Sequence, residues 1–263
     1  MNILAIDTSS KYFSLAITRD DILVSRVYEP LGRELSRQII PTIEKALKKS
    51  GLALKHIDYF ACGLGPGSFT GLRVGLATIK GLAFSLNKPI VGVGSLDIIA
   101  HSPRNKAGLP TGLPTGEAGR ICPLVDARRS LVYSALFCIE NGQLKRKSRY
   151  LLIPIKELLA KFNPQAKVLF SGDGLLLYRD DIEKKLKASA SFAEESFWYP
   201  LPENLLFLAR EKIANKEFSD LHTIVPLYLY PKECQIANSK SSRESGIPPS
   251  QTKAGQIANR DKQ

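Results

Sequence analysis

The sequence of 263 residues has few side chains that could bind a metal ion. Its three histidines, His56, His101 and His222, are widely spaced, and none has another histidine or a cysteine at ligand spacing. Its four cysteines show no CxxC spacing, and two of them lie in apolar runs, so we expect buried free thiols rather than disulfides or zinc ligands. The sequence therefore predicts no metal site.

Long apolar runs are absent as well. No stretch approaches the roughly 20 apolar residues that span a bilayer, and the opening residues, MNILAIDTSS, lack the basic, apolar and small-residue order of a signal peptide. With 44% hydrophobic residues, the chain can build one large or two modest cores. We therefore expect a globular protein of the cytoplasm that does not associate with a membrane.

Acidic residues are outnumbered, with 25 Asp and Glu against 37 Lys and Arg and a net charge of +12. A basic protein suits a partner that carries phosphates. Residues 236–263 carry five of the basic and two of the acidic residues. We read the remaining charge as spread along the chain, without a dense basic run or interleaved aromatic residues, so direct binding of nucleic acid is the less favoured interpretation.

Residues 1–102 read as three strands followed by alternating helices and strands. Short apolar runs separated by turns at TSSKY and TRDD predict an antiparallel meander. Apolar residues at spacings of three and four then predict a helix over 34–49. The strand DYFACGL, a helix over 70–86, the strand PIVGVG and a helix over 95–101 follow. This order is typical of a mixed α/β sheet flanked by helices, the ribonuclease-H-like arrangement.

The second half repeats this order without visible sequence identity. Residues 103–119 contain a doubled GLPTG and are rich in Pro, Gly and Thr, which predicts a flexible loop between two domains. In residues 120–235, the strand ICPLV is followed by LVYSALFCIE and QLKRKSRYLLI, which form a hairpin across Asn141 and Gly142. A helix, the strand KVLFSG and another helical stretch come next, so we expect a second, smaller lobe.

Two segments near the end of the sequence complete the predicted organisation. An amphipathic helix over 203–216 either belongs to the second lobe or packs back on the first. Residues 236–263 are polar and nearly without large apolar side chains, so we expect them to be disordered.

The stretch GLGPGSFTGLRVG, residues 63–75, lies between a predicted strand and a predicted helix. Gly65 and Gly67 allow a tight turn, Ser68 can cap the helix, and the free amides of a helix N-terminus attract anions. The stretch lacks the lysine of a P-loop and the dinucleotide fingerprint on the first strand of a βαβ unit. Two interpretations remain open, a phosphate cradle and a capped strand-to-helix turn.

Polar residues follow the first predicted strand of each half. Asp7, Thr8 and Ser9 could present a carboxylate and two hydroxyls to a phosphate or a magnesium ion, but the same residues are ordinary turn formers. Asp126 to Arg129, DARR, lie at the matching place in the second half, where they could clamp an anion or form an ion pair between domains. The candidate nucleotide-binding residues are Asp7, Thr8, Ser9, Gly65, Gly67 and Ser68.

The helix after the glycine-rich stretch is apolar around most of its circumference. Gly71, Gly75 and Thr78 lie on one side, where small residues let another backbone approach closely. This predicts burial on more than one side, either as a core helix or as a helix shared with a partner subunit.

In this order, ILAIDTS, GLGPGSFTGLRVGLATIKGLA, IVGVGSL, PLVDARRSLVYSALF and PLYLYP resemble the bacterial TsaB (YeaZ) family over nearly all of residues 1–235. The most specific element is GPGSFTGLRVG. The resemblance implies an α/β fold with two ribonuclease-H-like lobes, that of the actin, sugar kinase and heat-shock chaperone ATPase superfamily. It also implies a role in forming threonylcarbamoyladenosine next to the anticodon of tRNAs that read codons beginning with A.

The resemblance further implies a non-catalytic subunit that binds and activates TsaD, which transfers the threonylcarbamoyl group to tRNA. The HxxxH metal motif of TsaD, laid over GSLDIIA, falls on Ser95 and Ile99, which cannot ligate a metal. A four-helix packing with TsaD is expected, with TsaE in the same complex. The residues expected at the TsaD interface are Leu35, Ile39, Ile43, Leu47, Leu72, Gly75, Leu76, Ile79 and Leu82.

No cofactor of its own is expected for this chain, although ATP or threonylcarbamoyl-adenylate would lie near the interface of the complex. A homodimer of the free chain is also compatible with an apolar helix pair. Two positions depart from the family pattern: Leu35 replaces a frequent histidine, and Tyr230 follows Leu229 where relatives often have arginine. Both could alter partner contacts.

Two enzyme classes compete with this interpretation. A small-molecule kinase or ATPase of the same fold would use Asp7 with magnesium and the loop from Ser68 to Thr70 on phosphates. A protease is the weakest alternative, since no Ser/His/Asp or Cys/His set is suggested by the sequence.

Overall fold

A computed structural model of the protein describes residues 1–30, 32, 34–102, 116–163 and 165–230. The chain divides into two units, Met1–Leu229 and Tyr230–Gln263, and the elements below belong to the first. The predicted disordered tail and most of the predicted interdomain loop lie outside the described residues. The boundaries predicted for the two lobes stay predictions.

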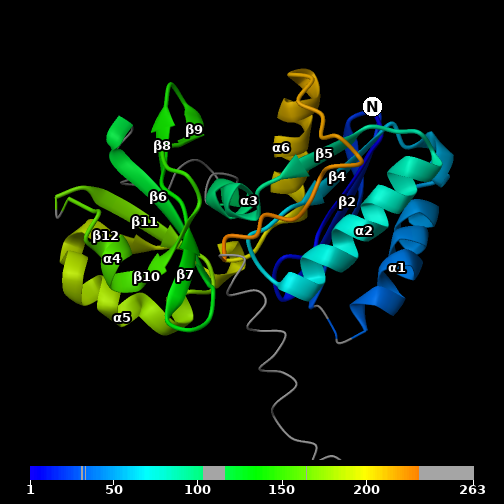
Figure 1. The fold of residues 1–263 in the computed structure, drawn as a ribbon. Helices are drawn as coiled ribbons and strands as arrows, with labels where there is room; N and C mark the ends of the chain where they lie inside the picture. Colours follow the sequence, from blue (N-terminus) through cyan, green and yellow to red (C-terminus); the bar gives the residue numbers. More distant parts are fainter. Residues whose placement is uncertain (31, 33, 103–115, 164, 231–263) are drawn as a thin grey trace, which may run out of the picture. The chain divides into compact units, whose positions relative to one another are not determined.

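The first sheet has the strand order β3-β2-β1-β4-β5 (Figure 1). β1, β2 and β3 form the predicted antiparallel meander, while β4 and β5 run parallel to β1. The strands are β1 Ile3–Asp7, β2 Tyr12–Arg19, β3 Ile22–Pro30, β4 Tyr59–Gly63 and β5 Ile90–Val93. The helices of this half are α1 Leu35–Lys49, α2 Phe69–Ser85 and α3 Ser95–His101, with a 3-10 turn η1 at Leu54–His56.

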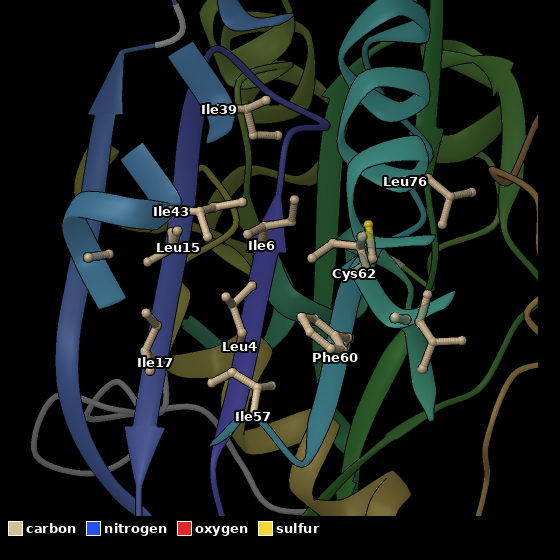
Figure 2. Close-up of a cluster of buried hydrophobic side chains, with 14 of the residues drawn as sticks. Leu4, Ile6, Leu15, Ile17, Ile39, Ile43, Ile57, Phe60, Cys62 and Leu76 are labelled. Atoms are coloured by element: carbon tan, nitrogen blue, oxygen red, sulfur yellow. The ribbon is translucent and has the colours of Figure 1, made fainter. Parts of the chain in front are cut away.

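Helices cover both faces of the first sheet. On one face, the apolar stripe of α1 packs with α2 on side chains of the strands, and Figure 2 shows Ile39 and Ile43 of α1 directed toward Leu15 and Ile6. On the other face, Leu205 and Ala209 of α6, Pro202–Ala214, are buried against the sheet. The helix expected over 203–216 therefore packs on the first sheet.

The second sheet repeats the order of the first, as β10-β7-β6-β11-β12, and with the same strand directions. This confirms the predicted α/β fold class and the predicted repetition. The strands are β6 Gly116–Asp126, β7 Leu131–Ser134, β8 Phe137–Glu140, β9 Gln143–Arg146, β10 Leu151–Pro154, β11 Lys167–Ser171 and β12 Ala190–Phe192. The helices are α4 Ile155–Leu159 and α5 Leu175–Leu186, with 3-10 turns η3 Lys187–Ser189 and η4 Glu195–Phe197.

The hairpin predicted across Asn141 and Gly142 is present, but each of its strands is interrupted. β7 and β8 both pair with β6 in one continuous register, with Leu124 opposite Ser134 and Ile121 opposite Phe137. The interruption lies beside Pro123, which has no N–H to donate to a neighbouring strand. The run LVYSALFCIE is therefore two strands rather than the single strand that its composition predicts.

Two other segments differ from the sequence prediction. β6 begins at Gly116, inside the predicted loop 103–119, because its first residues pair with β8 and β11. The composition of a segment does not predict whether it pairs with distant strands. Cys62, Cys122 and Cys138 are buried free thiols, as predicted, whereas Cys234 lies outside the described residues. Within the described ranges, no helix combines the length and the apolar composition needed to cross a bilayer.

Candidate functional site

The end of β1 and the glycine-rich segment after β4 form one packed cluster. The Asp7 side chain is fully buried, and its Oδ1 accepts hydrogen bonds from the Ser9 amide at 2.8 Å and from Ser9 Oγ at 2.7 Å. Its Oδ2 accepts a hydrogen bond from Ser95 Oγ of α3 at 2.8 Å. Both carboxylate oxygens are therefore engaged within the chain.

The loop after β4 is hydrogen-bonded to the same residues. The Gly65 amide donates to Ser95 Oγ at 3.0 Å, and the Ser95 amide donates to the Gly65 carbonyl at 2.8 Å. The Ser68 amide donates to the Ser9 carbonyl at 2.7 Å. Ser68 Oγ accepts a hydrogen bond from the Gly71 amide at 3.2 Å, so Ser68 caps α2 as predicted. The loop and the strand end thus hold each other in place.

Glycines permit this contact because no side chain fits at their positions. A Cβ on Gly67 would lie 2.2 Å from the Ser9 carbonyl oxygen, and one on Gly71 would lie 2.0 Å from the Thr8 carbonyl oxygen. A Cβ on Gly75 would lie 2.1 Å from Thr8 Oγ1. Thr8 Oγ1 also donates to the Gly71 carbonyl at 2.7 Å. The spacing of four between Gly67, Gly71 and Gly75 therefore places one face of α2 against the end of β1.

The structure brings the six candidate nucleotide-binding residues together, and it uses their polar groups for internal contacts. The amides of Ser9, Gly65 and Ser68 donate to protein acceptors, and the Asp7 carboxylate accepts three hydrogen bonds. This is the capped strand-to-helix turn, one of the two interpretations left open by the sequence. Nucleotide binding at this place stays a prediction.

Burial dominates the electrostatics of this cluster. It raises the pKa of Asp7 above 3.8, and the hydrogen bonds from Ser9 and Ser95 act in the opposite direction. Burial also raises the pKa of the neighbouring Cys62 thiol, with a smaller contribution from the Asp7 charge. In the part of the chain that the structure describes, no group of three or more His, Cys, Asp or Glu side chains could hold a metal ion.

The matching strand end of the second sheet is more open and carries more charges. Asp126 Oδ1 accepts a hydrogen bond from the Arg128 amide at 2.9 Å, and Asp126 Oδ2 lies 3.4 Å from Arg128 Nη1. The Asp126 amide donates to Asp173 Oδ1 at 3.1 Å. Burial raises the pKa of Asp173, the hydrogen bond from Asp126 lowers it, and the Asp126 charge raises it. The ion pair between Asp126 and Arg128 lies within one turn rather than between the two sheets.

Ser95 and Asp173 are the two polar residues of these clusters that sequence patterns did not identify as site residues. Ser95 follows a strand and opens α3, and Asp173 lies in the turn between β11 and α5. The sequence signal available for both was their position directly after a predicted strand. Their hydrogen bonds to Asp7 and to the Asp126 amide become visible only when the ends of neighbouring strands are placed side by side in the fold.

Most of the residues expected at a TsaD interface pack in the chain's own core, and the interface itself stays a prediction. Their stripes face the first sheet, because helical periodicity identifies an apolar face without identifying what covers it. Leu35 and Leu82 are half-buried, and Gly75 is buried against Thr8. The buried side chains of the expected interface are Ile39, Ile43, Leu47, Leu72, Leu76 and Ile79.

The helix pair also has exposed apolar side chains. Ile40 of α1 is 40% exposed and Phe84 of α2 is 68% exposed. A groove of about 410 Å³ lies beside α1, the residues that follow it and Leu82 of α2. Its lining residues are Ile40, Ile43, Glu44, Leu47, Lys48, Leu52, Leu54 and Leu82.

Comparisons with known proteins agree with this architecture. The family model described as TsaD, tRNA N6-adenosine threonylcarbamoyltransferase, matches residues 28–238. The chain is 31% identical over 236 residues to the tRNA threonylcarbamoyladenosine biosynthesis protein TsaB of Bacillus subtilis (strain 168), covering 89% of this chain and 96% of that protein. It is 37% identical over 143 residues to the TsaB protein of Escherichia coli (strain K12), covering 54% of this chain and 58% of that protein.

A solved structure extends the similarity to three dimensions. YeaZ from Pseudomonas aeruginosa superimposes with a TM-score of 0.73 at 27% identity, covering 87% of this chain and 99% of that one. Sequence and fold thus agree over most of the length of both chains. The chain belongs to the TsaB family of tRNA threonylcarbamoyladenosine biosynthesis proteins.

Proposed function

We propose that this protein is a non-catalytic subunit that binds and activates a TsaD-type threonylcarbamoyltransferase. The complex would form threonylcarbamoyladenosine next to the anticodon of tRNAs that read codons beginning with A. The observation that carries the proposal is the similarity over 89% of the chain to a protein named for the biosynthesis of this nucleoside.

The packing at the end of β1 supports the non-catalytic part of the proposal. A kinase or ATPase that used Asp7 with magnesium would need at least one carboxylate oxygen directed at the ion. Here both oxygens accept hydrogen bonds from Ser9 and Ser95, and the Asp7 side chain is fully buried. The backbone at Gly67 and Gly71 lies against Ser9 and Thr8, where a bound phosphate would have to fit.

The exposed side of α1 and α2 is the surface that we assign to the TsaD-type partner. It combines the groove beside Leu82 with the exposed side chains of Ile40 and Phe84. Exposed apolar side chains around a groove are typical of protein contact surfaces. In this proposal TsaE joins the same complex, and ATP or threonylcarbamoyl-adenylate binds near its interface.

Reconstitution of tRNA threonylcarbamoylation tests the proposed role. TsaD, TsaE, a source of threonylcarbamoyl-adenylate and an unmodified tRNA would be combined with and without this chain. We expect modification to require the chain, and the chain alone to be inert. Equal modification without it would contradict the role. ATP hydrolysis by the chain alone, lost in Asp7→Ala, would instead support a kinase or ATPase.

Two single variants test the partner surface. Because Ile40 and Phe84 are exposed, Ile40→Glu and Phe84→Glu are expected to fold normally and to weaken TsaD binding at least about tenfold. Leu176→Glu on α5 is a matched control, since Leu176 is 66% exposed and lies on another helix. Unchanged TsaD affinity in both interface variants would contradict this surface. Sedimentation of each variant would also show whether the same face forms a homodimer.

A further inference from the structure

The two sheets carry equivalent hairpins with different surface chemistry. In the first sheet, β2 and β3 are joined by Asp20 and Asp21, and in the second, β8 and β9 are joined by Asn141 and Gly142. All four turn residues have positive φ, as a two-residue turn of type I′ requires. The first hairpin thus has an acidic tip. The run KRKSR, residues 145–149, begins on the strand after the second turn and continues past the end of that strand at Arg146.

This run contains four basic residues in five positions, which the sequence analysis treated as part of a dispersed charge. The strand pairing adds a fifth, because Arg120 lies opposite Cys138, which lies opposite Lys145 on the next strand. Directly paired residues share one face of a sheet, so Arg120 and Lys145 lie on the same face, while Arg146 lies opposite Phe137 on the other face of this edge strand. We call this set the basic hairpin surface. Its residues are Arg120, Lys145, Arg146, Lys147 and Arg149.

The position of the run keeps its side chains accessible. β9 pairs with β8 and with no other strand among the described residues, so it is an edge of the sheet. Between the pairs Ser134–Leu151 and Phe137–Arg146, one strand has two residues and the other has four, residues 147–150. Such a bulge redirects side chains away from the regular sheet faces. Lys145, Lys147 and Arg149 are all exposed.

Acidic partners do not neutralise this surface. Arg146 lies 3.8 Å from Asp97 Oδ1, and its guanidinium is 4.0 Å from the ring centroid of Tyr150. Lys147 pairs with Glu140. Lys145 and Arg149 form no ion pair with any residue in the described ranges. The five cationic side chains of the surface thus have two carboxylate partners among the described residues, Asp97 and Glu140.

The surface also lacks the apolar centre of a protein contact. None of the large exposed hydrophobic side chains of the described residues lies between 137 and 150. The apolar residues of the hairpin, Phe137, Ile139 and Leu144, pack into a cluster beside α3. Protein interfaces usually have an apolar core with few charges, whereas polyanions are bound by accessible Lys and Arg. A polyanion therefore fits this surface better than a protein does.

We propose that the basic hairpin surface binds the sugar–phosphate backbone of tRNA. The proposal rests on the proposed function, which makes tRNA the substrate of the complex. Such contacts position an RNA without reading its sequence. The second lobe would thereby hold the tRNA, while the helices α1 and α2 of the first sheet remain available for the TsaD-type partner.

The test is the affinity of the full chain, alone and with TsaD, for an unmodified tRNA transcript at several salt concentrations. Lys145→Gln/Arg149→Gln removes the two cations without an ion pair. We expect tRNA affinity to fall about tenfold near 0.1 M salt, and the slope of log affinity against log salt to decrease by about 1 to 2. Lys184→Gln/Lys185→Gln on α5 removes the same charge and is expected to change affinity less than about twofold.

Unchanged tRNA affinity and salt slope in a folded Lys145→Gln/Arg149→Gln variant would overturn the proposal. An equal loss in the α5 control would also overturn it, since net charge rather than this surface would then be responsible. A variant that loses TsaD binding but keeps tRNA binding would assign the surface to an acidic protein. The modification assay is separate: if the wild-type chain is not required there, the proposed function fails, whereas the hairpin is judged on tRNA binding alone.

Discussion

The two sheets place an aspartate at the end of their first strand, but in opposite environments. Asp7 is fully buried and accepts three hydrogen bonds from Ser9 and Ser95. Asp126 is partly exposed, and its partner Arg128 has a side chain that is 88% exposed. Equal strand order therefore does not produce equal chemistry at equivalent positions.

The glycine-containing turns after β4 and β11 account for this difference. After β4, Gly67 and Gly71 pack on the backbone of Ser9 and Thr8, which covers the end of β1. After β11, a Cβ on Gly172 would lie 2.3 Å from the Leu124 carbonyl oxygen, and Asp173 of the same turn accepts a hydrogen bond from the Asp126 amide. The two turns thus contact the ends of β1 and β6 differently.

The largest effect on stability should come from a substitution that prevents the close contact between α2 and the end of β1 in the first sheet. In Gly71→Ala the new methyl group would overlap the Thr8 carbonyl, and two backbone segments would have to move. We expect the free energy of unfolding to fall by about 3 kcal/mol, measured by urea denaturation. Gly81→Ala is the control on the same helix, since a Cβ there meets nothing within 4 Å. It should raise stability by about 0.5 to 1 kcal/mol. Similar effects from both variants would show that helix propensity, not packing, explains the glycines.

A smaller loss is expected from Asp7→Ala. Removal of the Asp7 carboxylate leaves the buried Ser9 amide without its acceptor and creates a cavity beside Ser95. The free energy of unfolding should therefore fall by about 2 kcal/mol. Thermal unfolding measures this loss. If Asp7→Ala were as stable as the wild type, the network around Asp7 would have no structural role, and a functional role for this carboxylate would be favoured instead.

The stability of the protein should also depend on pH through Asp7. Since burial raises its pKa above 3.8, the native state holds this proton to a higher pH than the unfolded chain does. This contribution is fully present below the unfolded pKa and is lost as the pH rises through the folded pKa. Asp7→Asn should therefore gain stability relative to the wild type as the pH rises above the ordinary carboxyl pKa of 3.8. Urea denaturation at several pH values measures this, with Asp173→Asn as the counterpart in the second sheet. Parallel pH profiles of wild type and Asp7→Asn would contradict the expectation.

The smallest effect is expected from Asp126→Ala. The Arg128 partner of this ion pair is largely solvated, and the repulsion between Asp126 and Asp173 is relieved by the same substitution. Stability should change by less than about 1 kcal/mol, and the pKa of Asp173 should fall, which NMR titration of its carboxyl group would detect. A loss as large as that of Asp7→Ala would show that the two strand ends are equivalent after all.

Much of the secondary structure could be predicted from local patterns. The helix over 95–101, the cap at Ser68 and the turn at Asn141 and Gly142 depend on residues close in sequence, and all three are present. The interruption beside Pro123 was missed, because it depends on a strand that pairs across the sheet. Local sequence patterns therefore predict helices, caps and turns well, but they do not predict which strands pair.

Local patterns in the sequence predict the order of the elements, the fold class and, through GPGSFTGLRVG, the family. Which side chains of α1 and α2 are exposed follows from the three-dimensional packing, because an amphipathic stripe has the same spacing whether its own sheet or a partner covers it. The fold also packs Gly71 and Gly75 against Thr8, and it places the first two residues of KRKSR on an edge strand. Burial and charge depend on contacts between residues far apart in the chain, and these exist only once the sheets have formed.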